Sequence, residues 1–200
     1  MNRIVLATQN AHKAVEFRGI FADLGIEICT LEAFPGIGEI EEDAPTLEGN
    51  ALIKARAVFR HTGIPALADD TGLEVRYLND EPGVYSSRYA GPGATYADNV
   101  RKLLKAMRGV PPRRRGARFR CVLAFVPSAL AYRLAEGVVR GVILEKPRGS
   151  GGFGYDPVFL PHGETRTFAE MDLEAKNSLS HRARALAKVV EWLEAAPGAR

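Results

Sequence analysis

The N-terminal sequence alternates between two hydrophobic patterns, and this alternation restricts the possible folds more than any other feature. Residues 3–7 (RIVLA) form a short apolar run, which is typical of a buried strand. Apolar residues then recur three and four positions apart over residues 14–24, which predicts a helix with one apolar face that ends at Gly25. Residues 26–31 (IEICTL) predict another strand. The chain therefore opens with a strand–helix–strand unit.

Two long segments later in the chain have a different pattern. Residues 117–126 and 130–145 predict a pair of long antiparallel strands. We expect helices over residues 96–107 and from Ser180 onwards. A further helix is expected between Thr46 and Gly63, and the residues placed on its buried face are Leu52, Ala55 and Phe59. Early strand–helix–strand units and a later meander predict an α/β fold with a mixed β-sheet.

The composition is that of an ordinary globular protein. Apolar residues make up 46% of the 200 residues and charged residues 26%, and the net charge is only +3. This balance allows a buried core and argues at most weakly for a polyanionic partner. The one run of like charge, PPRRRG (111–116), is interpreted as a solvated loop, with nucleic-acid contact as the alternative.

Nothing in the sequence suggests export or a membrane. The N-terminal MNRIVLATQN lacks the pattern of a signal peptide, and no run approaches the ~18 apolar residues of a membrane span. Cys29 and Cys121 are too few for a disulfide framework and are expected to be buried free thiols. We expect a soluble cytoplasmic protein with neither nucleic acid nor membrane among its partners.

The segment TQNAHK (8–13) lies between the first strand and the first helix. The start of a helix offers free N–H groups and positive potential, and Thr8, Asn10 and Lys13 add side-chain donors. These groups are suited to a phosphate. The alternative is that Thr8 or Asn10 only caps the helix.

Two groups of carboxylates suggest a metal. The segment ALADDTGLEV (66–75) is interpreted as strand, turn and strand, and it places Asp69 and Asp70 on opposite faces. One of them is expected to face a cleft and the other to bond the backbone of the turn. An acidic loop supplies Glu41, Glu42 and Asp43. Carboxylates from two loops suit Mg²⁺, which pairs with substrate phosphates. The alternative is an Asx turn beside a solvated acidic loop.

The segment GSGGFGYDPVF (149–159) combines glycines with aromatic rings. Its G-x-G-x-x-G match is not a dinucleotide fingerprint, because Pro157 follows where a helix would have to open. We expect the glycines to let the backbone approach a ligand, Phe153 to stack on a flat base and Asp156 to accept a hydrogen bond.

Cations gather at the start of the last expected helix. Lys176, His181 and Arg182 lie just before it or in its first turn, where the helix dipole disfavours positive charge. Their presence there implies an anion, although Ser180 as a simple N-cap is the alternative. Cations, carboxylates and rings together fit a nucleoside triphosphate with Mg²⁺.

The motifs resemble those of one known family over nearly the whole chain, from about Ile4 to Leu193. TQNAHK, LEGNALIKARA, ADDTGLEV, GVYSSRYAG, GGFGYDPVF and KNSLSHR occur in the order seen in the inosine/xanthosine triphosphate pyrophosphatase family, also called Ham1-like. The resemblance implies a homodimeric, Mg²⁺-dependent enzyme with an elongated mixed sheet. It also implies a single domain (1–200) whose flanking helices form two lobes around a central cleft.

The resemblance also assigns roles to individual residues. The metal ligands would be Glu42 and Asp70, and Asp70 would also be the general base. The residues that would bind substrate are Thr8, Gln9, Asn10, Ala11, His12, Lys13, Lys54, Thr71, Phe153, Gly154, Tyr155, Asp156, Lys176, His181 and Arg182. Three residues depart from the family pattern. Thr71 stands where Ser is usual, Gln9 stands where Gly is frequent, and Gly49 stands where many members have Glu.

We therefore expect hydrolysis of noncanonical purine nucleoside triphosphates (ITP, dITP and XTP) to the monophosphate and pyrophosphate. This reaction would remove deaminated purines from the nucleotide pool. One alternative is a pyrophosphatase for modified pyrimidine nucleotides. The other is a non-catalytic nucleotide- or RNA-binding module, which would not need the two acidic clusters.

Overall fold

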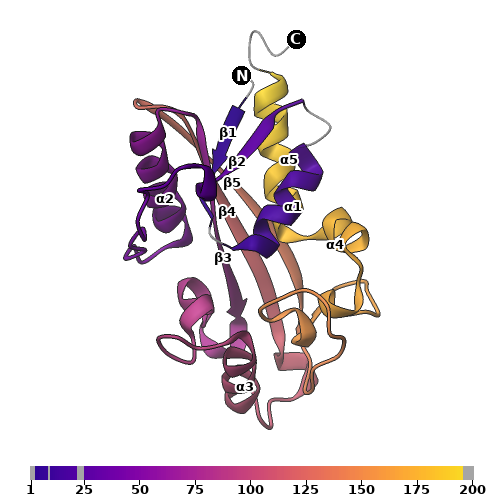
Figure 1. Ribbon diagram of the computed structural model, residues 1–200. Coiled ribbons are helices and arrows are strands. Elements are labelled where there is room, and N and C mark those ends of the chain that lie inside the picture. The colour runs from indigo at the N-terminus through magenta and orange to yellow at the C-terminus, as the bar shows by residue number, and fades with distance from the viewer. Residues whose placement is uncertain (1–2, 9, 22–24, 196–200) are drawn as a thin grey trace. The chain divides into compact units, whose positions relative to one another are not determined.

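The chain folds into a mixed α/β structure, and the computed structural model describes residues 3–8, 10–21 and 25–195 (Figure 1). Within the described residues, six strands form one sheet in the order β2-β1-β3-β4-β5-β6. The strands are β1 (Arg3–Leu6), β2 (Glu27–Thr30), β3 (Ala66–Val75), β4 (Gly116–Ser128), β5 (Ala131–Ile143) and β6 (Phe159–Pro161). The helices are α1 (Ala11–Phe21), α2 (Leu47–Thr62), α3 (Tyr96–Ala106), α4 (Leu173–Leu179) and α5 (His181–Glu194).

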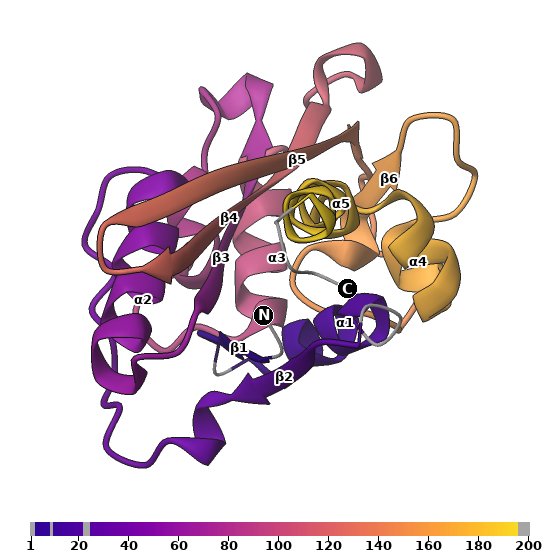
Figure 2. The same ribbon diagram turned by 90° about the horizontal axis from the view of Figure 1, so that it is seen from above.

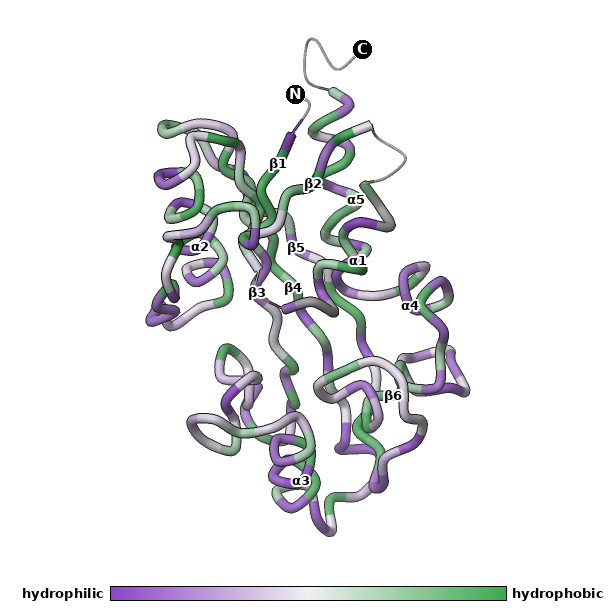
Figure 3. Tube along the Cα trace, viewed as in Figure 1, coloured by the Kyte–Doolittle hydropathy of each residue, from purple (hydrophilic) through white to green (hydrophobic). Residues whose placement is uncertain are grey.

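The chain divides into two compact units, and the long strands β3, β4 and β5 run from one into the other. Unit 1 contains residues 1–70, 121–137 and 182–200, and unit 2 contains residues 71–120 and 138–181. Each unit has a hydrophobic core of its own. Figure 3 shows hydrophobic stretches along the strands of both units.

Unit 1 is built on the N-terminal strand–helix–strand unit that the sequence predicts. β1 pairs in parallel with β2 and with β3, so Val5 lies opposite both Cys29 and Ala66. Helices α1 and α5 cover one face of the sheet and α2 covers the other (Figure 2). The first face is filled by apolar side chains such as Phe17, Phe21 and Leu186, all fully buried.

Unit 2 packs α3 and the segment after β6 against the other halves of the long strands. Its core contains Leu103 of α3 and Met107 just after it, together with Phe119, Phe159 and Phe168. The N-terminus of α3 is closed by a capping box between Thr95 and Asp98. No helix in the described ranges combines the length and apolar content needed to cross a membrane.

The prediction of a turn inside residues 66–75 is wrong. β3 is one continuous strand of 10 residues, and nearly every position in it is buried. Gly72 does not mark a turn. It allows a close approach of the backbone, because a Cβ at this position would lie 2.5 Å from the carbonyl oxygen of Gly83.

Three further predictions from the sequence need correction. The buried face of α2 includes Asn50, Ala51, Lys54, Ala55 and Val58, whereas Leu52 and Phe59 are only partly buried. The face is rotated because polar residues of α2 pair with a buried carboxylate. The helix α4 was not expected, since seven residues are too few to show a period. Arg115 of the PPRRRG run is buried rather than solvated.

Candidate active site

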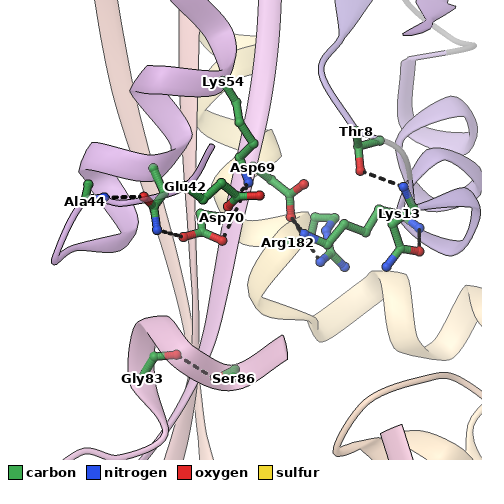
Figure 4. A network of polar contacts seen from close by, with 12 residues as sticks. Thr8, Lys13, Glu42, Ala44, Lys54, Asp69, Asp70, Gly83, Ser86 and Arg182 are labelled. Atoms are coloured by element: carbon green, nitrogen blue, oxygen red, sulfur yellow. Dashed lines mark hydrogen bonds and ion pairs between the residues drawn. The ribbon is translucent and has the colours of Figure 1, made fainter. Parts of the chain in front are cut away.

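The acidic loop and the strand β3 bring two carboxylates of unit 1 to one lysine. The Nζ atom of Lys54, on α2, lies 2.8 Å from Oε2 of Glu42 and 3.7 Å from Oδ1 of Asp70. Figure 4 shows both carboxylates pointing towards the end of the Lys54 side chain. The sequence prediction that Glu42 and Asp70 act at one place thus has a geometric counterpart.

Asn50 connects the acidic loop to Asp70, and sequence reasoning did not identify it as a site residue. Its Oδ1 accepts a hydrogen bond from the backbone N–H of Ala44 (2.9 Å), and its Nδ2 donates to Oδ2 of Asp70 (3.3 Å). The side chain is buried at 1% exposure. The available signal was the four-residue spacing of Asn50 and Lys54, which places both on one helical face.

Gly49 explains how the acidic loop can pack so closely against the start of α2. A Cβ at this position would lie only 2.5 Å from Cβ of Ala44 and 3.2 Å from Oγ1 of Thr46. Thr46 caps the helix by accepting a hydrogen bond from the N–H of Gly49 (3.1 Å). The glycine that departs from the family pattern therefore makes room for the loop that carries Glu42.

The surroundings of Asp70 and Lys54 shift the pKa of both side chains. Burial raises the pKa of Asp70 above its ordinary value, and the charges of Lys54 and Lys13 only partly oppose this effect. Burial alone would lower the pKa of Lys54, but Asp70, Asp69 and Glu42 raise it overall. Lys54 therefore stays positively charged, while Asp70 binds a proton more readily than an exposed aspartate.

Asp69 has different partners, on the opposite face of β3. Its Oδ2 lies 2.8 Å from Nζ of Lys13, on α1, and 3.3 Å from an Nη of Arg182, at the start of α5 (Figure 4). The side chains of Asp69 and Arg182 are 0% and 2% exposed, and that of Lys13 is 16% exposed. The prediction of opposite faces is confirmed, but the assignment of Asp69 to a turn is wrong.

The pKa of Asp69 is shifted in the opposite direction from that of Asp70. Burial by itself would raise the pKa of Asp69, but the charges of Lys13, Arg182 and Lys54 together bring it well below its ordinary value. Asp69 therefore stays ionised and acts as the counter-charge for two of the predicted phosphate ligands.

The loop before α1 has the internal bonds of a helix start. Oγ1 of Thr8 accepts from the N–H of Asn10 (3.2 Å), and Oδ1 of Asn10 accepts from the N–H of Lys13 (3.4 Å). Ala11 and His12 open α1, and their side chains are not among those described. Gln9 lies outside the described residues.

In unit 2, the glycine-rich segment and α4 form a second polar cluster. Nζ of Lys176 lies 2.8 Å from Oδ2 of Asp156 and 4.7 Å from the centre of the Phe153 ring. Lys176 and Asp156 are 4% and 3% exposed. The structure thus brings together Phe153, Asp156 and Lys176. The Phe153 ring also contacts Tyr96, with ring centres 6.0 Å apart.

Gly152 of this segment serves a close contact inside the protein. Oδ2 of Asp156 accepts from the N–H of Phe153 (2.9 Å), and a Cβ at Gly152 would lie 2.2 Å from the same oxygen. Gly152 also has a φ of +68°. The absence of a side chain at Gly152 therefore makes room for the Asp156 carboxylate.

The remaining predicted residues of unit 2 lie in different surroundings. Tyr155 is buried, its hydroxyl donates to the carbonyl of Ser86 (2.9 Å), and burial raises its pKa. His181 is also buried, stacked on Phe119 with ring centres 4.7 Å apart. Thr71 directly follows Asp70 in β3, and Gly154 has a φ of +62°.

The residues present fit a magnesium ion that is completed by its substrate. In the described part of the chain, no three His, Cys, Asp or Glu side chains form a metal-binding group. Mg²⁺ nevertheless needs only one or two protein carboxylates when phosphates supply further oxygens. Glu42 and Asp70 already converge on one cation, the ammonium of Lys54.

The chain is similar to known proteins over its full length. The model of the Ham1 family matches residues 4–192. A dITP/XTP pyrophosphatase of Methylococcus capsulatus is 50% identical over 98% of both chains, and one of Geobacter sulfurreducens is 47% identical over 96% of this chain and 97% of its own. The solved structure of a HAM1 protein from Coxiella burnetii is 43% identical, with a TM-score of 0.90 over 98% of this chain and 100% of that chain.

Proposed function

The chain belongs to the Ham1 family, and from this premise we propose that it hydrolyses noncanonical purine nucleoside triphosphates to the monophosphate and pyrophosphate. The substrates would include ITP, dITP and XTP, so that deaminated purines leave the nucleotide pool. The observation that carries the proposal is the convergence of Glu42 and Asp70 on Lys54, a site for a cation and a phosphate.

Mg²⁺ would be held by Glu42 and Asp70. When bound, it would neutralise phosphate charge and make a coordinated water more acidic. Two features of the chain support this assignment. Asn50 holds one oxygen of Asp70, and the acidic loop is fixed to α2 through Ala44. Both carboxylates are thus positioned before any ligand arrives.

Asp70 would act as the general base. Its carboxylate accepts the proton of the water that attacks the α-phosphorus, and pyrophosphate leaves with the bond electrons. A general base must lie within reach of the proton that it accepts, and Asn50 supports this role by holding the Asp70 carboxylate in place. Lys54, held beside Asp70, would offset the charge that develops on the phosphates.

Lys13 and Arg182 would supply further positive charge for the triphosphate. Lys13 is the more accessible of the two, so it would make the direct contact. Arg182 is fully buried on Asp69, and its part would be to orient Asp69 and, through it, Lys13. The backbone N–H groups at the start of α1 would add uncharged donors.

Lys176 would read the base. Hypoxanthine and xanthine carry an oxygen at position 6, where adenine carries an amino group. An ammonium donates hydrogen bonds and accepts none, so Lys176 can bind the oxygen but not the amino group. Asp156 holds the ammonium beside Phe153, and the Phe153 ring would stack on any purine.

A substrate panel tests the function. Pyrophosphate release should require Mg²⁺ and be much faster with ITP and XTP than with ATP or with modified pyrimidine triphosphates. Asp70→Asn should lower turnover at least ~10²-fold, whereas Asp43→Asn, in the exposed part of the acidic loop, should not. Binding of ITP without any pyrophosphate release would favour a binding module, and preference for a pyrimidine would favour the second alternative.

We further propose that the protein acts as a homodimer in the cytoplasm. The homodimer is supported by exposed tyrosines on unit 2, among them Tyr85 at 56% exposure. The location is supported by the proposed substrates, which belong to the cellular nucleotide pool.

A further inference from the structure

Unit 2 contains a groove of strong positive charge that the proposed reaction does not use. This open groove has a volume of about 740 Å³ and runs along the second half of α3 and the loop after β5. Its cations are Arg101, Lys105, Arg108, Arg115 and Lys146. Glu145 is the one carboxylate among its described lining residues. Figure 1 shows α3, which carries two of these cations and ends just before a third.

The charge of this groove is local and does not reflect the whole chain. The protein has 27 Lys and Arg against 24 Asp and Glu, but no acidic residue occurs between Asn99 and Arg120. Arg101 pairs with Asp98, whereas Lys105, Arg108 and Lys146 are exposed and make no ion pair within the described structure. The groove thus concentrates positive charge that is balanced elsewhere in the chain.

Arg115 adds a buried charge that no carboxylate of the described residues offsets. Its guanidinium donates to the carbonyl oxygens of Ile143 (2.6 Å), Met107 (2.8 Å) and Leu144 (2.9 Å), and at 3.4 Å to that of Val110. All four acceptors are neutral, and the residue is 5% exposed. The carbonyl oxygens satisfy its donors but carry no net charge, so the positive charge of Arg115 adds to that of the groove.

The dipole of α3 is too small to explain why so many cations line the groove. The C-terminal end of α3 carries about half a negative charge. It favours basic residues such as Lys105 and Arg108 near the end of the helix. Five cations face one lining carboxylate, however, and Asp98 offsets only Arg101. A large positive surplus remains.

The lining also indicates which kind of anion fits. Arg and Lys side chains are well suited to phosphate oxygens. No aromatic ring is among the described lining residues, so the groove offers nothing on which a base could stack. Its volume is that of a small-molecule site and exceeds what one phosphate group needs. We propose that this groove binds a free inorganic polyphosphate chain, with tripolyphosphate as the shortest suitable probe.

The test is a titration of the ¹⁵N-labelled full-length protein with tripolyphosphate, without Mg²⁺ and at constant ionic strength. Amide signals of α3 and of Glu145 and Lys146 should shift and saturate. Arg108→Glu should weaken this binding at least tenfold (~1.4 kcal/mol). The matched control is Arg166→Glu, an exposed arginine of unit 2 outside the groove, which should leave the affinity unchanged. The same titration of Lys13→Ala should still shift the groove signals.

Three results would overturn the proposal. Shifts confined to residues near Lys13 would show that tripolyphosphate binds only with the proposed active-site cations. Equal effects of sulfate would show a general ion atmosphere. Saturable groove shifts with a duplex RNA but not with tripolyphosphate would assign the groove to nucleic acid. Because the proposal does not rest on the proposed reaction, ITP hydrolysis by Arg108→Glu should match that of the unmodified protein.

Discussion

At the scale of residues, two neighbouring aspartates have opposite environments. Asp69 faces Lys13 and Arg182, and Asp70 faces Asn50 and Lys54. The reason is that successive side chains of a strand point to opposite faces. One carboxylate therefore stabilises the fold and two of the cations, while the other lies beside the acidic loop, where it can serve chemistry.

Removing the charge of Asp69 should destabilise the protein. Asp69→Asn leaves Lys13 and Arg182 without their common counter-charge, and breaking a buried ion pair costs about 3–5 kcal/mol. The free energy of unfolding, measured in denaturant, should fall by about that amount. Asp43→Asn removes an exposed carboxylate and should change it little. Equal, small effects of both variants would contradict the structural role of Asp69.

The stabilising effect of Asp69 should depend on pH in a defined way. The pKa of Asp69 lies below its ordinary value of 3.8 in the folded state. Its contribution to stability is therefore complete above the unfolded pKa and is lost as pH falls below about 3.8 towards the folded pKa. The difference in unfolding free energy between the unmodified protein and Asp69→Asn should be constant near neutral pH and should narrow only in acid. Narrowing between pH 7 and about 5 would contradict this assignment.

Base selection should depend on Lys176. Lys176→Ala should lower kcat/KM for ITP far more than for ATP, because a site built on hydrogen bonds can reject the wrong group by ~10⁴ or more. Phe153→Ala is the control, since stacking treats purines alike and should weaken both substrates by similar factors. If the ratio of kcat/KM for ITP to that for ATP is unchanged in Lys176→Ala, another residue recognises the 6-oxygen.

At the scale of elements, the acidic loop and α2 function as one piece. Asn50 bonds the loop backbone and Asp70 at once, and Gly49 leaves room for the methyl group of Ala44. Helix α2 thus positions Glu42 indirectly, by holding the acidic loop, and it carries Lys54 on its own buried face. The position of Glu42 depends on a glycine that has no part in the chemistry.

Gly49→Ala tests this dependence. The new methyl would lie 2.5 Å from Cβ of Ala44, so the loop has to move and Glu42 with it. We expect the Mg²⁺ concentration for half-maximal activity to rise about tenfold, as the loss of ~1.4 kcal/mol would produce. Gly38→Ala is the matched control in the same loop, because a Cβ there meets nothing within 4 Å. Identical Mg²⁺ dependence of both variants would count against the role of the loop.

At the scale of the whole molecule, each unit has its own core, and three long strands belong to both. The aromatic residues that remain exposed are mainly tyrosines. Tyr85 of unit 2 and Tyr132 of unit 1 are 56% and 48% exposed, and each lies under an arginine, Arg88 and Arg56 respectively. Such rings are common at protein interfaces.

We expect a homodimer whose interface includes Tyr85. Sedimentation velocity should show a species of twice 21.8 kDa, and Tyr85→Asp should shift it towards the single-chain mass. Arg166→Asp, at an exposed non-aromatic position of unit 2, is the control and should leave the dimer intact. A single-chain mass for the unmodified protein would contradict the dimer, and dimers in both variants would place the interface elsewhere.

The sequence alone predicted the family, the α/β class with its mixed sheet and the opposite faces of Asp69 and Asp70. The family match and the sheet confirm the first two, and the partners of the two aspartates confirm the third. These features depend on local periodicity and on long motifs, which a sequence displays directly. The roles assigned to the site residues, the magnesium ion, the homodimer and the central cleft stay predictions.

Only the tertiary structure showed which charges are neighbours. Asn50, the partners of Asp69, the contact of Gly152 with Asp156 and the buried Arg115 all depend on how the chain packs. The local sequence predicts a turn at Gly72 and a solvated side chain at Arg115. Both predictions are wrong because a sequence pattern does not show which residues pack against each position. Burial and pairing are properties of the packed chain, and they decide whether a charge binds a ligand, holds a neighbour or does both.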